Sequence, residues 1–239
     1  MVDRVPWVVG VSGASGTPYA RAVITGLLDA GEAVDLVVSR AARLTLLDEV
    51  GRTIRDGHWR DDLADWLGRD VAGVRYWSAG DLAAGPSSGS YRARGMVVVP
   101  ASTAAVAGIA LGLSKDLLQR AADVNLKERR PVVVVPRETP LSRGHLIHLL
   151  ALHDAGAVVL PASPGFYAGT ATVQELVDFV AGKVLDSLGV DHTLFTRWRG
   201  QLGAARTGRA DAERPSTGEG AAFAPAASPV VGEDLTDFR

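Results

Sequence analysis

The stretch VPWVVGVSGASGTP, residues 5–18, decides the fold of this chain. Its first half, residues 5–11, is a continuous apolar run, which indicates a strand buried on both faces of a sheet. The second half combines glycines, which let a backbone approach a ligand, with hydroxyl side chains, and Pro18 suits a first helical turn. This order predicts a cradle for an anion or a cofactor, with a plain glycine turn as the alternative. The stretch matches neither a P-loop nor the dinucleotide-binding glycine pattern.

The pattern of strand followed by helix recurs along the chain. Residues 131–135, Pro-Val-Val-Val-Val, form the clearest buried strand, and the strand at 95–99 is expected to end at Pro100. Continuous apolar strands need helices on both faces of their sheet. The pattern therefore predicts an α/β fold, a three-layer, doubly wound, mostly parallel sheet of the Rossmann or flavodoxin-like kind. Strands are expected at 5–11, 33–38, 74–77, 95–99, 131–135 and 157–160, and helices at 18–30, 40–50, 59–67, 102–111, 114–129, 142–155 and 172–188.

The composition excludes several classes of protein. The chain has 239 residues, with 25 Lys and Arg against 27 Asp and Glu, so it lacks the basic excess of a general nucleic-acid binder. It has no cysteine, which excludes disulfide scaffolds, thiolate metal sites and cysteine nucleophiles. The N-terminus does not read as a targeting segment, and no apolar run approaches the ~18 residues of a membrane span. We therefore expect a cytoplasmic protein without a membrane segment.

The chain divides into two regions by composition. Residues 1–199 carry the strand and helix patterns and are expected to form a single α/β domain. Residues 200–239 are rich in Ala, Gly and Pro and show no apolar period. Such a segment cannot bury enough surface to offset about 1–2 kcal/mol of backbone ordering per residue, so we predict a flexible C-terminal tail.

Ligands of open α/β sheets bind beyond the carboxyl ends of the strands, so the residues that follow each strand are site candidates. Ser39 follows the second strand, and Ser102 and Thr103 follow the strand at 95–99. Each hydroxyl could simply cap a helix. Hydroxyls after two strands of one sheet nevertheless begin to outline a single pocket.

Two stiff loops follow later strands. Arg137 and Glu138 lie between two prolines, where a guanidinium suits a phosphate and a carboxylate suits proton transfer. A surface ion pair between them is the alternative. The loop at 161–167 also contains prolines and ends in the phenol of Tyr167.

Other charged or titratable residues do not by themselves indicate a site. Arg120, Asp123 and Lys127 share one face of the helix predicted at 114–129, and such a run is usually a solvated face. The five histidines show no metal-ligand spacing supported by carboxylates, so no metal site is expected.

Taken together, these loops resemble those of the flavin prenyltransferases (UbiX type) of the homo-oligomeric flavin-containing decarboxylase-like superfamily. The resemblance covers roughly residues 5–198, and its most specific blocks are Lys-Glu-Arg-Arg-Pro at 127–131 and Pro-Arg-Glu-Thr-Pro-Leu at 136–141. The segments that carry the match are 12–16, 38–42, 88–90, 100–103, 120–131, 136–141 and 161–167.

The resemblance implies a reaction. Members of the family join a dimethylallyl group from dimethylallyl phosphate to N5 and C6 of reduced FMN without a metal, and the prenylated FMN serves a partner decarboxylase. The resemblance also implies a homo-oligomer, built from trimers or a dodecamer, in which a neighbouring subunit can contribute to the site.

The resemblance further implies roles for individual residues. The residues implied to bind FMN are Gly13, Ala14, Ser15, Ser39, Ser102, Thr103, Ala104, Ala105 and Arg137. Those implied to bind the substrate phosphate are Arg120, Lys127, Arg137, Tyr167 and Lys183. Those implied to assist ring closure are Ser15, Glu49 and Glu138.

Two alternatives share the same fold. A flavin-dependent decarboxylase of the cysteine-decarboxylase type would be expected to carry a histidine on an early helix, and residues 40–50 contain none. A non-catalytic flavin-binding subunit would be expected to have lost some of its charged site residues, which are all present here. The chain departs from the family pattern at 100–102, where Pro-Ala-Ser replaces Pro-Cys-Ser, and at Lys183, which stands in place of an arginine.

Overall fold

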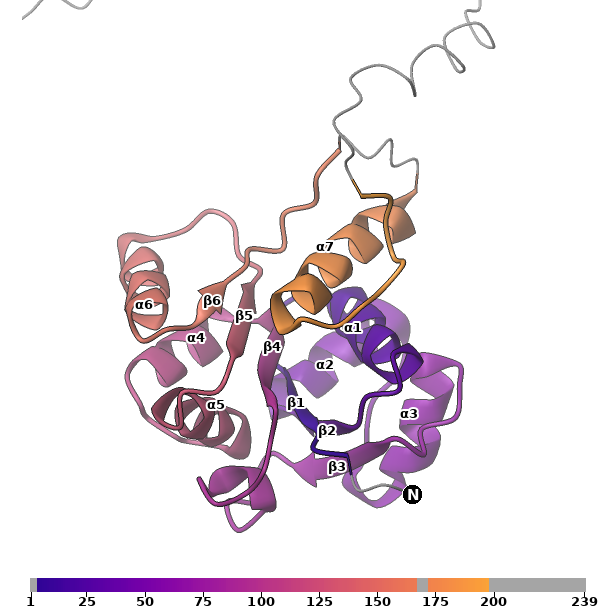
Figure 1. Cartoon of the computed structure of the whole chain (residues 1–239), viewed down its shortest axis with the longest axis horizontal. Helices are drawn as coiled ribbons and strands as arrows, with labels where there is room; N and C mark the ends of the chain where they lie inside the picture. Colours follow the sequence, from indigo (N-terminus) through magenta and orange to yellow (C-terminus); the bar gives the residue numbers. More distant parts are fainter. Residues whose placement is uncertain (1–3, 167–171, 198–239) are drawn as a thin grey trace, which may run out of the picture. The chain divides into compact units, whose positions relative to one another are not determined.

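A parallel sheet forms the centre of the protein (Figure 1). The computed structural model describes residues 4–166 and 172–197, and within them six strands pair in the order β3-β2-β1-β4-β5-β6, every pair parallel. From β1 the chain adds β2 and β3 on one side and then β4, β5 and β6 on the other. The strand order therefore reverses between β1 and β4, which is the topological switch point. The strands are β1 (Trp7–Val11), β2 (Val34–Val38), β3 (Val74–Ser78), β4 (Gly95–Ala101), β5 (Val132–Pro136) and β6 (Val158–Val159).

Helices cover both faces of the sheet, as the predicted three-layer α/β fold requires. Helices α1, α2, α3 and α7 contribute to one buried core, and α4, α5 and α6 to a second. The predicted doubly wound architecture is confirmed. The helices are α1 (Thr17–Asp29), α2 (Arg40–Val50), α3 (Trp59–Leu67), α4 (Thr103–Ala110), α5 (Leu117–Lys127), α6 (Arg143–Asp154) and α7 (Val173–Leu188), with short 3-10 turns at Asp56–His58 and Gly85–Ser87.

Strand β1 shows why its sequence is apolar without alternation. Trp7 and Val9 pack into the core beneath α1, whereas Val8, on the opposite face, packs into the core beneath α5. Gly10 faces α5 as well, where an added Cβ would lie 3.0 Å from Cγ of Leu118. Because both faces of the strand are covered, neither face can carry polar side chains.

Strand β4 differs from the sequence expectation at its end. It continues through Pro100 to Ala101 instead of stopping before the proline. Proline has no N–H to donate to a sheet, and the register with β5 shifts between Val98 and Ala101 before pairing resumes opposite Pro136. This resumed pairing brings the loops that follow β4 and β5 to the same edge of the sheet.

Some predictions fall outside the residues described. Tyr167 and the whole of residues 200–239 lie there, so the expected tail and the domain boundary at residue 199 stay predictions. Among the helices that are described, none has the length and apolar character needed to cross a membrane.

Candidate functional site

A cavity of about 180 Å³ opens at the carboxyl ends of β1, β2 and β4. The loop after β1 and the N-termini of α2, α4 and α5 form its walls. Complete small-molecule sites usually measure about 300–1,000 Å³, so this cavity encloses only part of such a ligand. Its lining residues are Ser12, Gly13, Ser39, Arg40, Ala41, Ser102, Ala104, Ala105, Asp116, Leu118 and Gln119.

The structure brings most of the predicted flavin-binding residues to this cavity. Five of them line it directly, and Ala14 is buried in the loop beside them. Thr103 is the first residue of α4, next to the lining residue Ser102. A second, larger cavity of about 300 Å³ lies between the end of α1 and residues 191–194 and contains none of the predicted site residues. The five that line the site are Gly13, Ser39, Ser102, Ala104 and Ala105.

Gly13 lets the loop after β1 lie directly on α2. A Cβ at this position would lie 2.4 Å from Cβ of Ala41, closer than two nonbonded carbon atoms can approach. The loop therefore exposes bare backbone at the cavity, as the glycine-rich pattern predicts.

Ser12 joins the ends of β1 and β4 across the switch point. Its side chain is 2 % exposed, and its Oγ donates to the carbonyl of Pro100 at 2.8 Å. The same Oγ accepts the backbone N–H of Ser102 at 2.7 Å. One hydroxyl therefore holds the start of α4 against the β1 loop.

Two serines cap the helices that begin at the cavity. Ser39 Oγ accepts the N–H of Ala42 at 3.1 Å, and Ser102 Oγ accepts the N–H of Ala105 at 3.2 Å. The helix cap, which is the alternative interpretation of each hydroxyl, is therefore observed for both. The first backbone amides of a helix have no partner within it. In each helix the two amides before the capped one have no hydrogen bond within the described part of the chain, so four donors converge near the cavity.

Glu49, near the end of α2, caps the N-terminus of α1, although the two lie far apart in the sequence. Gly16, the N-cap of α1, has no side chain to cap with. The Glu49 carboxylate instead accepts the N–H of Gly16 at 2.8 Å, the N–H of Thr17 at 2.9 Å and the hydroxyl of Thr17 at 2.6 Å. Partial burial raises the pKa of Glu49, but these bonds and one from the Ser15 side chain outweigh it and lower the pKa overall. Glu49 is thus an ionised acceptor held beside Ser15.

Arg137 holds the same turn from the other side. Its Nε donates to the carbonyl of Ser15 at 2.9 Å, and its own N–H bonds the carbonyl of Ala101 at 3.2 Å. The turn after β1 is thus fixed by a carboxylate on its amides and by a guanidinium on its carbonyl. Both charged groups come from the predicted site set.

Glu138 bonds to its own loop. The residue is exposed, and its Oε1 accepts the N–H of Thr139 at 3.0 Å. No ion pair joins Glu138 to Arg137 among residues 4–166 and 172–197, so the alternative of a surface ion pair is not observed. The carboxylate instead stands on the stiff loop with room for a second contact.

The cations predicted for the substrate phosphate do not meet in one copy of the chain. Arg120 pairs with Asp123 at 2.7 Å and donates to the carbonyl of Ser87 at 3.0 Å. Lys127 ends α5 and pairs with Glu128 at 2.5 Å. Arg120 therefore lies near the start of α5, next to the lining residue Gln119 but outside the lining itself, whereas Lys127 lies at the opposite end of the helix.

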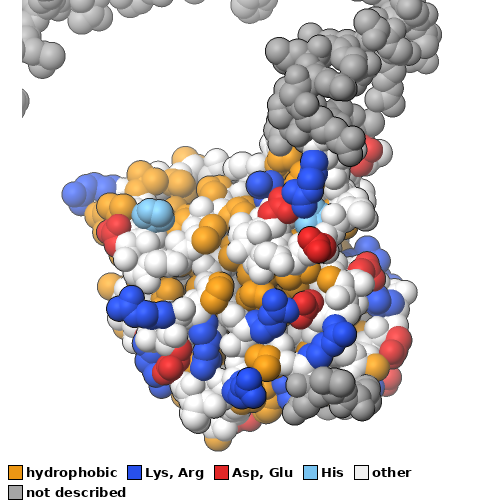
Figure 2. Space-filling model, in the orientation of Figure 1, with side chains coloured by type: hydrophobic (Ala, Val, Ile, Leu, Met, Phe, Trp, Pro, Cys, Tyr) orange, Lys and Arg blue, Asp and Glu red, His pale blue; other side chains and the backbone are white. Residues whose placement is uncertain are grey.

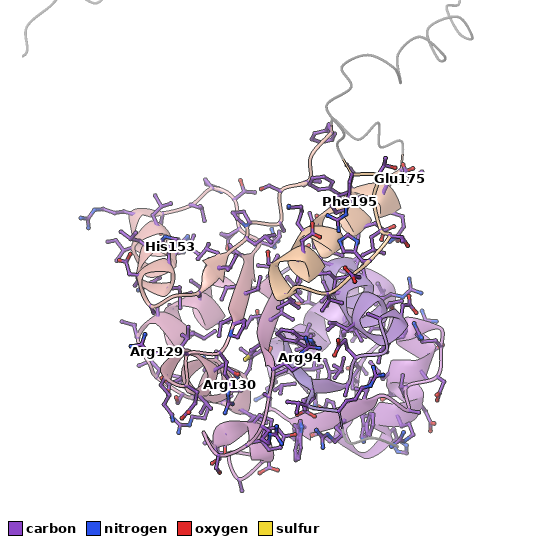
Figure 3. All side chains as sticks on the ribbon, in the orientation of Figure 1. Arg94, Arg129, Arg130, His153, Glu175 and Phe195 are labelled. Atoms are coloured by element: carbon purple, nitrogen blue, oxygen red, sulfur yellow. The ribbon has the colours of Figure 1, made fainter. Side chains whose placement is uncertain are left out.

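Strand β5 separates Lys127 from Arg137. Lys127 precedes this strand and Arg137 follows it, and five residues of extended chain span about 16 Å. Figure 3 places Arg129 and Arg130 near the same end of α5 as Lys127. Figure 2 shows Lys and Arg side chains spread across this part of the molecular face.

The remaining predicted phosphate ligands lie elsewhere. Lys183 is an exposed residue of α7, 3.7 Å from Asp186. Tyr167 lies outside the described residues. Within those residues, no group of three or more His, Asp or Glu side chains is placed to hold a metal.

One wall of the cavity was missed in the sequence. Asp116, Leu118 and Gln119, at the start of α5, line it opposite the β1 loop. Their helix does not directly follow a strand, so a search of strand ends does not reach them. The available signal was Asp116, a typical N-cap residue, whose carboxylate accepts the N–H of Gln119 at 2.9 Å.

The Glu49 cap predicts a pH-dependent contribution to stability. A carboxyl with a lowered pKa in the folded state stabilises fully above its ordinary pKa of 4.5 and loses that effect as the pH falls through the lower value. The free energy of unfolding should therefore differ most between wild type and Glu49→Gln at neutral pH and converge below pH 4.5. Urea unfolding from pH 7 to pH 3 measures this. Asp48→Asn, at the exposed neighbour, is the control, and a difference independent of pH would contradict the assignment.

The Ser12 bridge predicts that removing its hydroxyl group lowers the stability of the fold. In Ser12→Ala the partly buried N–H of Ser102 loses its acceptor, which should lower the free energy of unfolding by about 1–3 kcal/mol. Denaturant unfolding measures this. The matched control is Ser90→Ala, which removes an exposed hydroxyl bonded to Ser88 and should change little. Equal effects of the two substitutions would refute the bridging role.

Comparisons with known proteins agree with this geometry. Residues 1–185 match the family model described as Flavoprotein. The chain is 68% identical to Flavin prenyltransferase UbiX of Streptomyces coelicolor over 212 residues, covering 84% of this chain and 98% of that protein.

Solved structures give the same result. The crystal structure of AnUbiX (PadA1) in complex with FMN and dimethylallyl pyrophosphate is 36% identical, with a TM-score of 0.74, and the match covers 83% of this chain and all of that one. A dodecameric FMN-dependent UbiX-like decarboxylase from Escherichia coli O157:H7 is 37% identical, with a TM-score of 0.73, and the match covers 82% of this chain and all of that one. The chain therefore belongs to the UbiX-type flavin prenyltransferases of the flavoprotein family.

Proposed function

We propose that this protein joins the dimethylallyl group of dimethylallyl monophosphate to N5 and C6 of reduced FMN, and that the prenylated FMN passes to a partner decarboxylase. The observation that carries the proposal is the cavity at the switch point, where helix amides and bare backbone converge. Membership of the prenyltransferase family favours this reaction over cysteine decarboxylation, and no feature of the site favours a non-catalytic flavin-binding subunit.

The residues at the cavity fit a flavin with a phosphate. Helix N-termini attract anions because their amides are unpaired and their dipoles point outward. The amides at the starts of α2 and α4 supply this, and Gly13 leaves room for a ligand against the backbone. We assign FMN binding to the loop after β1 together with Ser39, the turn at 102–105 and Arg137.

The reaction requires that the negative charge on the departing phosphate be stabilised. Reduced FMN supplies the nucleophilic atoms, and cleavage of the allylic C–O bond leaves the bonding electrons on the phosphate. Fixed cations stabilise that developing charge. Within one copy, Arg137 binds the loop after β1 and Arg120 is paired within α5 near its start, whereas Lys127 lies at the far end of that helix. We therefore place Arg120 and Lys127 of a neighbouring copy at the site, with Lys183 and Tyr167.

A homo-oligomer would complete the site in this way. The cavity of about 180 Å³ is small for a whole cofactor, as expected if a second copy closes it. Helix α6 carries exposed apolar side chains at Leu146, Ile147 and Leu150, which suit burial against another copy. The dodecameric structure from Escherichia coli is consistent with such an assembly.

The carboxylates take different parts in the proton steps. Glu49 accepts hydrogen bonds around Ser15 and has a lowered pKa, so we assign it to holding that turn and the Ser15 hydroxyl in place. Glu138 is exposed on the loop that contains Arg137, and we assign it to accept a proton released during ring closure. The departing phosphate is a second proton acceptor.

The proposed reaction predicts a heavier flavin. After anaerobic incubation with reduced FMN and dimethylallyl monophosphate, the extracted flavin should gain the mass of one dimethylallyl unit. Mass spectrometry of that flavin is the measurement, and a parallel incubation with the diphosphate tests the choice of leaving group. Bound flavin of unchanged mass under both conditions would contradict the proposal.

A site shared between copies predicts complementation. Arg137→Ala and Lys127→Ala should each be inactive alone, and their co-expression should restore adduct formation because some mixed sites contain both wild-type residues. The control pairs Arg137→Ala with Glu138→Ala. Those two residues enter a site on the same loop of one copy, so no recovery is expected. Equal recovery in both pairs, or in neither, contradicts a site that takes Lys127 from another copy.

A further inference from the structure

The α5 wall of the cavity carries a hydrogen-bond donor that has no partner among the described residues. Gln119 lines the cavity, and its Oε1 accepts the N–H of Lys115 at 3.2 Å, which fixes the orientation of the amide. Its Nε2 has no hydrogen bond to any residue in the part of the chain that the structure describes. An amide nitrogen that is oriented and unpaired at a cavity wall is available to donate to a ligand.

Gly108 provides the surface on which this amide rests. A Cβ built at Gly108 would lie 2.5 Å from Cδ and Oε1 of Gln119 and 2.6 Å from Nε2. The amide group therefore lies against the bare Cα of the glycine in α4. Glycine inside a helix is destabilising relative to alanine. The close contact with the Gln119 amide explains why a glycine stands at position 108.

The charge of the wall indicates which part of a ligand it meets. Asp116 and Leu118 line the cavity beside Gln119, so this wall offers a carboxylate, an apolar side chain and an amide, but no cation. A phosphate dianion would be repelled by the Asp116 carboxylate. An uncharged carbonyl or hydroxyl oxygen would not.

We infer that Gln119 is a further flavin-contacting residue, whose Nε2 donates to an oxygen of the flavin ring or its ribityl chain. The inference rests on the proposed function, since it takes FMN as the ligand of the cavity. Gly108 is a positioning residue for this contact, because it leaves the space in which the Gln119 amide lies.

The test compares the affinities of four proteins for FMN and for riboflavin, followed by flavin fluorescence. Gln119→Met keeps the length of the side chain without its amide and should weaken FMN binding by about 3- to 10-fold. Gly108→Ala should displace the Gln119 amide and weaken binding by a similar factor, while its melting temperature stays the same or rises. Gly144→Ala, a helical glycine in α6 outside the cavity lining, is the matched control beside wild type and should leave the affinity unchanged.

Riboflavin separates the two parts of the ligand. It lacks the phosphate, so the same loss should be measured with riboflavin if the donor meets the ring or the ribityl chain. Unchanged FMN affinity in Gln119→Met or in Gly108→Ala overturns the inference, and so does a loss that disappears with riboflavin. Wild-type protein that binds no FMN would overturn the proposed function as well, whereas normal wild-type binding with unaffected variants overturns the Gln119 contact alone.

Discussion

The hydroxyl of Ser12 holds the two strands at which the strand order of the sheet reverses. It joins the end of β1 to the carbonyl of Pro100 and to the N–H of Ser102, and so fixes the start of α4 beside the glycine loop. The cavity exists because these two strand ends stay in contact while their connections leave to opposite faces. Every other part of the site is placed relative to this junction.

Charged groups at the site act first on the protein itself. Glu49 fills the capping position that Gly16 leaves empty, and Arg137 binds the carbonyl of Ser15. The turn that would face a flavin is therefore rigid before any ligand arrives, which reduces the ordering cost of binding. The lowered pKa of Glu49 has the same origin, because hydrogen bonds to the ionised form favour it.

A single copy divides the proposed cations between the two ends of the sheet. Arg137 follows β5, while Lys127 precedes it, and the strand keeps them apart. The sequence places both in highly specific blocks only a few residues apart, 127–131 and 136–141. Their proximity in sequence therefore does not bring them together within one chain, and the proposed shared site would require a second copy to supply its Lys127.

The sequence by itself determined the doubly wound fold, since apolar runs without alternation require burial on both faces, and it located the strand-end loops that reach the cavity. Only the tertiary structure decided the rest. The cap that Glu49 provides joins it to Gly16, 33 positions away in the sequence, and no local pattern encodes such a contact. The wall formed by Gln119 depends on α5 packing against Gly108 of α4. Periodicity reports which face of an element is buried, whereas a site depends on which elements meet, and that is settled by packing.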